Sequence, residues 1–240
     1  MDISKLTRGM RKALPLKKCA AVIVAAGSAS RMGGIDKVMA PLDGEPMIKR
    51  TVRAFQNCDA VSEIVIVTRP DLILPIKTLC AGYDKVTTVV AGGKSRQESV
   101  NLGLSAVGKD TQLAAIHDGA RPLITWQLID CCIRAANTYG AAAPAIPVKD
   151  TIKTVEGGIV VDTPERAKLR AVQTPQVFDY DLLRGALKKA AEDGAEVTDD
   201  CSAVERLGMK IKIVEGDERN IKVTTPMDLK IAEMLLEERK

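Results

Sequence analysis

The sequence is poor in aromatic residues and histidine, and these shortages exclude several classes of protein. Aromatic side chains make up 2% of the 240 residues, so base-stacking surfaces for single-stranded nucleic acid are nearly absent. The formal net charge of +4 is too small to indicate nucleic-acid binding by itself. With His117 as the single histidine and no Cys-x-x-Cys pair, neither a zinc site nor a disulfide framework fits. We therefore expect no nucleic-acid partner, and six reduced cysteines in a cytoplasmic protein.

Long apolar runs are missing as well. No stretch of 18 apolar residues occurs, so we expect neither a membrane span nor a membrane partner. The first 18 residues are basic but lack the apolar centre of a signal peptide, and we interpret residues 1–18 as a mobile tail. A hydrophobic content of 46% is enough for one substantial core, and residues 19–240 are expected to form a single domain.

Short apolar segments alternate with segments of helical periodicity along the chain. The strand-like segments are 19–27, 63–68, 86–92, 113–119, 141–148 and 210–216. Helices are predicted at about 46–57, 71–82, 95–107, 126–138, 179–192, 199–207 and 226–239. Most of the strand-like segments show no alternating polarity, which is typical of strands covered on both faces. The pattern predicts an α/β fold with a Rossmann-like, doubly wound, mostly parallel sheet that binds its ligand beyond the carboxyl ends of the strands.

Residues 151–163 depart from this alternation. They form two strand-like arms around Glu156-Gly157-Gly158, which predicts a β-hairpin that protrudes from the sheet, within an arm at about 150–172. A protruding hairpin has little core in which to bury itself. A partner subunit is one way to cover it.

The last predicted helix carries clear start signals. Thr225 can cap it, Pro226 suits its first turn, and an acidic residue follows. The apolar stripe of this helix is expected to face the core; it consists of Met227, Ile231, Met234 and Leu235.

The segment AAGSASRMGGIDK, residues 25–37, is the first candidate for ligand binding. It follows the first strand-like segment, and its small residues let backbone N–H groups approach phosphate oxygens closely. Arg31 offers a planar fork for two oxygens, and Lys37 offers a point charge. The alternative is a glycine-rich turn with two solvated cations. Its position after a buried strand favours phosphate binding.

A second loop, AGGKSRQES at residues 91–99, imitates the end of a P-loop. The first glycine of that motif would have to stand at position 88, which is occupied by Thr88, so a P-loop is excluded. The loop still precedes a helix that Ser95 can cap. Ser99 and the glycines of the loop are therefore left as candidates for contact with a ligand.

Three further residues add charge to the predicted site. Asp118 ends a predicted strand, where a carboxylate can hold Mg²⁺ against phosphates. Arg121 follows it and could bind an acidic group or pair with Asp118. Lys222 precedes the last helix, next to Thr224, which can donate a hydrogen bond; this segment alone favours a solvated lysine.

With these segments in place, the chain from Cys19 to Glu238 resembles the 2-C-methyl-D-erythritol 4-phosphate cytidylyltransferases. The resemblance is carried, in order, by AAGSASRMGG…DK, AGGKSRQESV, HDGARP, PVKDTIK, AVQTPQVF, EVTDDCSAVE and NIKVTTPMDL. It implies a GT-A-like nucleotidyltransferase fold and transfer of CMP from CTP to 2-C-methyl-D-erythritol 4-phosphate, with release of pyrophosphate, in non-mevalonate isoprenoid biosynthesis. It also implies Mg²⁺ as the cofactor and a homodimer formed through the β-arm.

The resemblance assigns roles to residues by position. It implies catalytic roles for Arg31, Lys37 and Lys222, and Mg²⁺ binding for Asp118. Nucleotide binding is implied for Ala25, Ala26, Gly27, Gly92, Gly93, Ser99 and Asp118. Binding of the polyol phosphate substrate is implied for Arg121, Thr151, Arg166, Thr198, Asp199 and Thr224. Thr151 and Arg166 match arm residues that reach into the pocket of the neighbouring subunit.

The chain departs from the family pattern in its nucleotide loops. The gap between Arg31 and Lys37 is one residue shorter than usual, Val38 and Met39 replace a polar-aromatic pair, and Lys94 stands where an acidic residue is common. The short first loop is shared with molybdenum-cofactor guanylyltransferases. The last five segments do not fit those enzymes.

Two other functions remain as alternatives. A cytidylyltransferase for ribitol phosphate or another polyol phosphate shares NIKVTTP and TPQ, but the segment TDDCSAVE favours methylerythritol phosphate. The other is a non-catalytic CTP-sensing module of the same fold. Retention of Arg31, Lys37, Asp118 and Lys222 argues against it.

Overall fold

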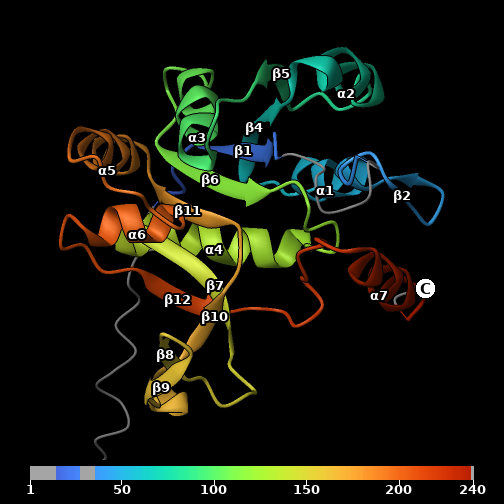
Figure 1. Ribbon diagram of the computed structural model, residues 1–240. Helices are drawn as coiled ribbons and strands as arrows, with labels where there is room; N and C mark the ends of the chain where they lie inside the picture. The colour runs from blue at the N-terminus through green and yellow to red at the C-terminus, as the bar shows by residue number, and fades with distance from the viewer. Residues whose placement is uncertain (1–14, 28–35, 239–240) are drawn as a thin grey trace, which may run out of the picture.

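The computed structural model describes residues 15–27 and 36–238, and a sheet of eight strands forms the centre of that part of the chain (Figure 1). The strands are β1 (Cys19–Ala25), β4 (Val61–Thr68), β5 (Val86–Ala91), β6 (Leu113–Asp118), β7 (Ala141–Pro147), β10 (Arg170–Val172), β11 (Gln176–Asp179) and β12 (Lys212–Glu215). Two small ribbons pair β2 (Pro41–Leu42) with β3 (Glu45–Pro46) and β8 (Thr154–Glu156) with β9 (Ile159–Asp162).

The sheet is mostly parallel, as the alternating pattern predicts. The strand order is β10-β7-β11-β6-β1-β4-β5, and β12 pairs with β7. β1 runs parallel to both β6 and β4, and β4 runs parallel to β5. β11 is antiparallel to β6 and β7, and β10 is antiparallel to β7. Neither β10 nor β11 was predicted. Their polar residues and the nearby Pro175 interrupt any continuous apolar segment, and both strands pair only with segments that are distant in the sequence.

Every predicted helix is present. The helices are α1 (Met47–Gln56), α2 (Ile73–Leu79), α3 (Arg96–Ser105), α4 (Trp126–Tyr139), α5 (Tyr180–Glu192), α6 (Asp200–Glu205) and α7 (Pro226–Glu237), with short 3₁₀ helices η2 (Pro70–Leu72) and η3 (Arg166–Lys168). The predicted caps also form, since Ser95 accepts a hydrogen bond from Glu98 N–H and Thr225 accepts one from Asp228 N–H. Within the described ranges, no helix has both the length and the apolar character needed to cross a membrane.

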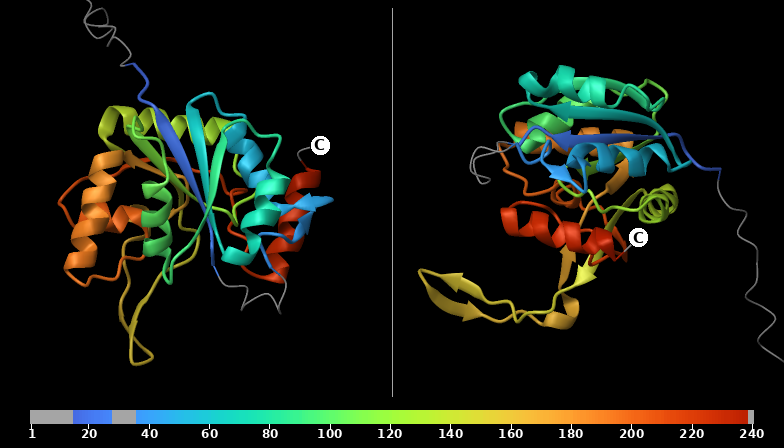
Figure 2. Two further views of the ribbon diagram at one scale, coloured as in Figure 1. Left: turned by 90° about the horizontal axis from the view of Figure 1, so that it is seen from above. Right: turned by 90° about the vertical axis from the view of Figure 1, so that its right-hand side faces the viewer.

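Helices cover both faces of the sheet, as Figure 2 shows, and core residues fill the space on each side. Along β1, Ala21 and Ile23 point to the face covered by α1, α2 and α4, whereas Val22 points to the face covered by α3, α5 and α6. This two-sided burial explains why the strand segments lack alternating polarity.

α3 packs very closely on the sheet at Gly103. A Cβ atom at this position would lie 2.4 Å from Val22 Cγ1 and 2.7 Å from Val67 Cγ2. The absence of a side chain therefore lets α3 approach β1 and β4, and this holds the start of α3 near the carboxyl ends of those strands.

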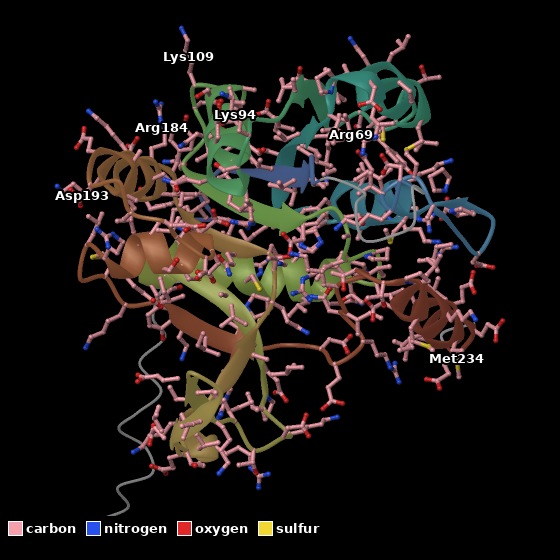
Figure 3. The ribbon with its side chains drawn as sticks, in the orientation of Figure 1. Arg69, Lys94, Lys109, Arg184, Asp193 and Met234 are labelled. Atoms are coloured by element: carbon pink, nitrogen blue, oxygen red, sulfur yellow. The ribbon has the colours of Figure 1, made fainter. Side chains whose placement is uncertain are left out.

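The predicted core stripe of α7 is wrong for three of its four residues. Met227, Ile231 and Met234 are 64%, 40% and 66% exposed, and Figure 3 shows Met234 on the outer side of the helix. The helix instead turns Leu229, Ala232, Leu235 and Leu236 toward a small cluster formed by Leu42, Met47, Ala120, Leu123 and Val223. α7 packs on loops and the β2 ribbon rather than on the sheet, so periodicity alone could not identify its buried face.

The hairpin of β8 and β9 projects from the rest of the chain at the predicted place (Figures 1 and 2). Its turn consists of Gly157 and Gly158, whose φ angles of 56° and 83° favour glycine. The strands of the hairpin are exposed on both faces.

Most of the predicted N-terminal tail, residues 1–14, lies outside the described residues. Just before β1, Lys17 Nζ lies 2.9 Å from Asp179 Oδ2, and the backbone N–H of Lys17 donates to Asn137 Oδ1. The chain is thus attached to the body of the protein directly ahead of the first strand.

The close contact at Gly103 leads to a stability prediction. We expect Gly103→Ala to lower the free energy of unfolding by about 1–2 kcal/mol, because the new methyl group overpacks against Val22 and Val67. The same change at Gly185, which has open space around its Cβ position in α5, should stabilise the protein by about 0.5–1 kcal/mol through helix propensity. Urea denaturation of both variants measures the two effects, and shifts of the same sign would contradict the packing argument.

Candidate active site

A cavity of about 310 Å³ lies at the carboxyl ends of β1 and β6, beside the start of α3. It is lined by Val24, Ala25, Ala26, Gly27, Lys37, Val38, Gly93, Lys94, Ser95, Arg96, Ser99, Asp118, Ala120 and Lys222. The structure thus brings together the predicted residues Ala25, Ala26, Gly27, Lys37, Gly93, Ser99, Asp118 and Lys222. This is the edge at which open α/β sheets bind ligands.

Gly92 lets the two glycine-containing loops meet behind the cavity. A Cβ atom on Gly92 would lie 2.4 Å from Ala26 Cβ and 2.8 Å from Ser99 Oγ. Ser99 Oγ accepts a hydrogen bond from Gly93 N–H at 3.1 Å and donates to the Ser95 carbonyl at 2.9 Å. Ser99 therefore fixes the shape of this loop, and Gly92 has a supporting role outside the cavity lining.

Asp118 is surrounded by three cationic side chains. Lys222 Nζ lies 2.9 Å from Asp118 Oδ2, Arg121 Nε lies 3.6 Å from the same oxygen, and Arg96 Nε lies 3.7 Å from Oδ1. Burial acts to raise the pKa of Asp118, but the nearby Lys222 and Arg96 outweigh it and lower the pKa to about 2. The carboxylate is therefore ionised at neutral pH.

Two hydrogen bonds bring Lys222 to the end of β6 from the far end of the sequence. Arg121 NH1 donates to the Asn220 carbonyl at 2.6 Å, and Val223 N–H donates to the Ala120 carbonyl at 2.8 Å. Lys222 lies between these two anchored positions, which is why it points at Asp118. Arg121 pairs with Asp118, which is one of the two roles that the sequence left open for it.

A buried polar segment between β10 and β11 supports the same region. Thr174 Oγ1 accepts a hydrogen bond from Asp118 N–H at 3.1 Å, and the Thr174 carbonyl accepts one from Asn220 Nδ2 at 2.9 Å. Gln173 Nε2 donates to the Asp217 carbonyl at 2.8 Å. These residues tie the loop that carries Lys222 to the strand that carries Asp118.

Gln176 connects this segment to the start of α6. Its Nε2 donates to Asp199 Oδ2 at 2.7 Å, and its Oε1 accepts from the backbone N–H groups of Asp200 and Cys201, both at 3.0 Å. Sequence reasoning gave no role to Gln173, Thr174 and Gln176. The sequence signal that could have indicated a role was the group of polar residues between the two short apolar stretches of AVQTPQVF.

The other predicted substrate residues lie outside the cavity lining. Thr198 is exposed, Asp199 caps α6, and Thr224 Oγ1 donates to Asp228 Oδ2 at 2.9 Å. Thr151 and Arg166 are exposed on the arm, where Arg166 NH1 donates to the Lys149 carbonyl at 2.9 Å. Arg31 lies outside the described residues.

Sequence reasoning missed Arg96 as a residue of the site. It stands in the first turn of α3, directly after the glycine-containing loop, so its position next to a capped helix start was the available signal. Its NH2 group lies 2.7 Å from Asp200 Oδ2. Lys94, noted as a departure from the family pattern, also lines the cavity, and its backbone N–H donates to Glu98 Oε2 at 2.7 Å.

His117 is fully buried beneath Asp118 and is held by a defined chain of hydrogen bonds. The Arg121 carbonyl beside Nε2 can only accept, so Nδ1 is the acceptor of the neutral ring; Thr174 Oγ1, which accepts from Asp118 N–H, donates to this Nδ1 at 2.9 Å. The other ring nitrogen, Nε2, then carries the proton and faces the Arg121 carbonyl at 3.4 Å. Burial is the main cause that lowers the pKa of His117 to about 3.

Comparison with known proteins agrees with this geometry. The family model for 2-C-methyl-D-erythritol 4-phosphate cytidylyltransferase matches residues 19–238. The protein of that name from Caldanaerobacter subterraneus subsp. tengcongensis is 46% identical over 221 residues, which cover 90% of this chain and 97% of that protein. The crystal structure of 4-diphosphocytidyl-2C-methyl-D-erythritol synthase from Anaerococcus prevotii superposes with a TM-score of 0.84 at 31% identity, covering 92% of this chain and 96% of that one. The Thermus thermophilus cytidylyltransferase structure gives 0.75 at 32% identity, covering 90% and 98%.

The buried histidine makes stability depend on pH in a predictable direction. Its folded-state pKa of about 3 lies below its usual value of 6.5, so from pH 6.5 downward the unfolded chain takes up a proton that the folded chain does not. The stabilisation is complete above pH 6.5 and is lost as the pH falls toward 3. Between pH 7.5 and 5, we expect the free energy of unfolding to decrease by about 2 kcal/mol from this group.

Urea denaturation at a series of pH values measures this effect. His117→Gln, which retains hydrogen-bonding capacity without a titrating group, should have a flatter pH dependence than the wild type in that interval. Parallel curves for the two proteins would contradict the assignment, because His117 is the single histidine of the chain.

Proposed function

Because the chain belongs to the 2-C-methyl-D-erythritol 4-phosphate cytidylyltransferase family, we propose that the cavity at β1 and β6 is where CMP is transferred from CTP to 2-C-methyl-D-erythritol 4-phosphate. The reaction releases pyrophosphate and belongs to the non-mevalonate route to isoprenoid precursors. The observation that carries this assignment is the convergence of Lys37, Lys222 and Asp118 on one cavity beside a glycine-containing loop.

The charges in the cavity suit an attack by one phosphate on another. The acceptor phosphate oxygen attacks the α-phosphorus of CTP in line, and pyrophosphate leaves. Both reactants are anions, so their mutual repulsion is a large part of the barrier. We propose that Lys37 and Lys222 lower it by stabilising the negative charge that builds up on the α-phosphate and on the leaving group. Arg31, the third proposed cation, rests on the family resemblance alone.

No general base is required for this chemistry, because a phosphate monoester is already largely ionised at neutral pH. This agrees with the environment of His117, whose low pKa and buried position remove it from proton transfer. Its role is to support Asp118 through Thr174.

Asp118 is the residue that we propose as the protein ligand of Mg²⁺. It is the only carboxylate among the described residues that line the cavity, and its low pKa keeps it charged. The described part of the chain has no group of three or more His, Cys, Asp or Glu side chains that could enclose a metal ion. This suits Mg²⁺, which is often held by one or two carboxylates together with substrate phosphates and water. When bound, the ion would neutralise charge on the phosphates of CTP.

The exposed arm supports a homodimer with shared sites. Val155, Ile159, Val160 and Val161 are each more than half exposed, and a two-stranded hairpin is marginally stable alone. We propose that a second copy of the chain covers this hairpin, and that Thr151 and Arg166 contact the acceptor in the cavity of that copy. The acceptor is proposed to contact four further residues of the subunit that holds the cavity: Arg121, Thr198, Asp199 and Thr224.

A cytoplasmic location is proposed on the basis of the six free thiols.

The two lysines provide the direct test of this function. We expect Lys37→Ala and Lys222→Ala each to lower kcat by about 10²–10³, with a smaller effect on CTP affinity, because their charges act mainly in the transition state. Pyrophosphate release from CTP and 2-C-methyl-D-erythritol 4-phosphate measures the rate. Wild-type protein should release little pyrophosphate with ribitol 5-phosphate as acceptor or GTP as donor.

Lys109→Ala is the matched control. Lys109 is exposed and follows α3 at the end opposite to the cavity, at the edge of the molecule in Figure 3, so its loss should leave the rate unchanged. Near-normal single-turnover rates in both cavity variants would overturn the proposed roles. A preference for ribitol 5-phosphate would overturn the substrate assignment.

Shared sites predict that two inactive variants restore activity when mixed. Asp118→Ala should inactivate the cavity of its own subunit, and Arg166→Ala should weaken acceptor binding in the cavity of the partner. In a mixed dimer, one cavity retains its own Asp118 and receives an intact arm. An equimolar mixture of subunits should therefore recover about a quarter of the wild-type rate.

Mixtures must be unfolded and refolded together, or incubated until subunits exchange, before activity is measured. The sedimentation coefficient of each variant alone checks that it still forms a dimer. A mixture whose rate never exceeds that of the separate variants, at any mixing ratio, would argue for sites contained within one subunit.

A further inference from the structure

The two carboxylate oxygens of Asp118 have different partners. Oδ2 faces Lys222 Nζ at 2.9 Å and Arg121 Nε at 3.6 Å, whereas Oδ1 faces Arg96 Nε at 3.7 Å. The side chain of Lys222 is long and 42% exposed, so it can leave Oδ2 without disturbing buried structure. The partner of Oδ1 is in a different situation, because Arg96 is held from a second side.

Arg96 is anchored by a carboxylate that takes no other part in the site. Arg96 NH2 lies 2.7 Å from Asp200 Oδ2, and the Asp200 side chain is only 1% exposed. Asp200 does not line the cavity. A buried carboxylate is costly unless it is paired with a cation and hydrogen-bonded. The pair with Arg96 meets this requirement, and it fixes one edge of the guanidinium.

The anchor is itself rigidly placed. Asp200 begins α6, and its backbone N–H donates to Gln176 Oε1 at 3.0 Å. Gln176 belongs to β11, where it pairs with Ile116 of β6, two residues before Asp118. Contacts therefore lead from Asp118 to Arg96, then to Asp200 and to Gln176. Gln176 pairs with β6, the strand that carries Asp118, so the contacts form a closed ring.

We propose that Arg96 is a positioning residue. Asp200 holds Arg96 in place, and Arg96 fixes Oδ1 of Asp118. Meanwhile Oδ2 of Asp118 releases Lys222 and binds the incoming ligand. This inference rests on the proposed function, since the ligand is the metal–nucleotide complex. Arginine suits the task because its planar group presents several N–H donors in a fixed geometry and can serve two carboxylates at once. A lysine at position 96 would supply charge at a single nitrogen, whereas Arg96 reaches Asp118 with Nε and Asp200 with NH2.

The proposal predicts a common phenotype for two residues, of which Asp200 lies outside the cavity. Arg96→Lys and Asp200→Asn should each lower kcat by about 10- to 100-fold, the range typical of residues that orient a metal ligand. Each should also weaken Mn²⁺ binding about 10-fold, measured without turnover by electron paramagnetic resonance in the presence of CTP and no acceptor. The double variant should be no worse than the more affected single variant, because both changes break the same support.

The exposed pair of Arg134 and Asp130 on α4 provides matched controls. These side chains are 2.6 Å apart and lie outside the cavity lining, so Arg134→Lys and Asp130→Asn should leave kcat and Mn²⁺ affinity unchanged. Urea denaturation identifies any variant that fails to fold; if Asp200→Asn does, Arg96→Lys alone tests the proposal.

The possible outcomes separate this inference from the proposed function. Wild-type rate and Mn²⁺ affinity in folded Arg96→Lys, or losses in the double variant that multiply those of the single variants, would overturn the positioning role alone. A wild-type protein that neither binds Mn²⁺ with CTP nor releases pyrophosphate would overturn the proposed function, and this inference with it.

Discussion

The hydrogen bonds that join the end of β6 to a loop near the end of the chain are the contacts on which the arrangement of the site depends. They hold Asp118 and Lys222, which both line the cavity, 2.9 Å apart. Three cations around a single carboxylate would repel one another unless the backbone held them in place. The hydrogen bond from Arg121 to the Asn220 carbonyl and the one from Asp118 N–H to Thr174 Oγ1 do this, because they fix both sides of the pair before any ligand binds.

Much of the fold was predictable because its signals are local. A buried parallel strand is visible as a continuous apolar segment, and a helix start is visible as a cap such as Ser95 or Thr225. Parallel strands place all their carboxyl ends at one edge, so loops that follow different strands must meet there. For this reason Lys37 and Asp118 could be assigned to the same site although no local pattern connects them.

The rest depends on contacts between distant segments. β11 exists because β6 and β7 offer it antiparallel partners, and α7 buries Ala232 rather than Met234 because of the loops on which it lies. Thr174 and Gln176 are ordinary polar residues in the sequence, and their function appears only in the fold, where burial leaves their polar groups dependent on partners from β6 and α6. Arg96 was missed for the same reason, since its partners are supplied by β6 and α6.

The balance of charge in the cluster explains how the same residues can be stable without ligand and active with it. Lys222, Arg121 and Arg96 bring three positive charges, and Asp118 and Asp200 bring two negative charges, so the cluster carries a single excess positive charge. A polyphosphate that enters adds negative charge next to Lys222, the most exposed of the three cations, and competes with Asp118 for it. In the proposed reaction, the freed carboxylate of Asp118 would hold the metal ion, while Arg96 would stay with Asp200. In this proposal, binding redistributes existing charges instead of creating a new site, and it requires that one cation be mobile and another be anchored.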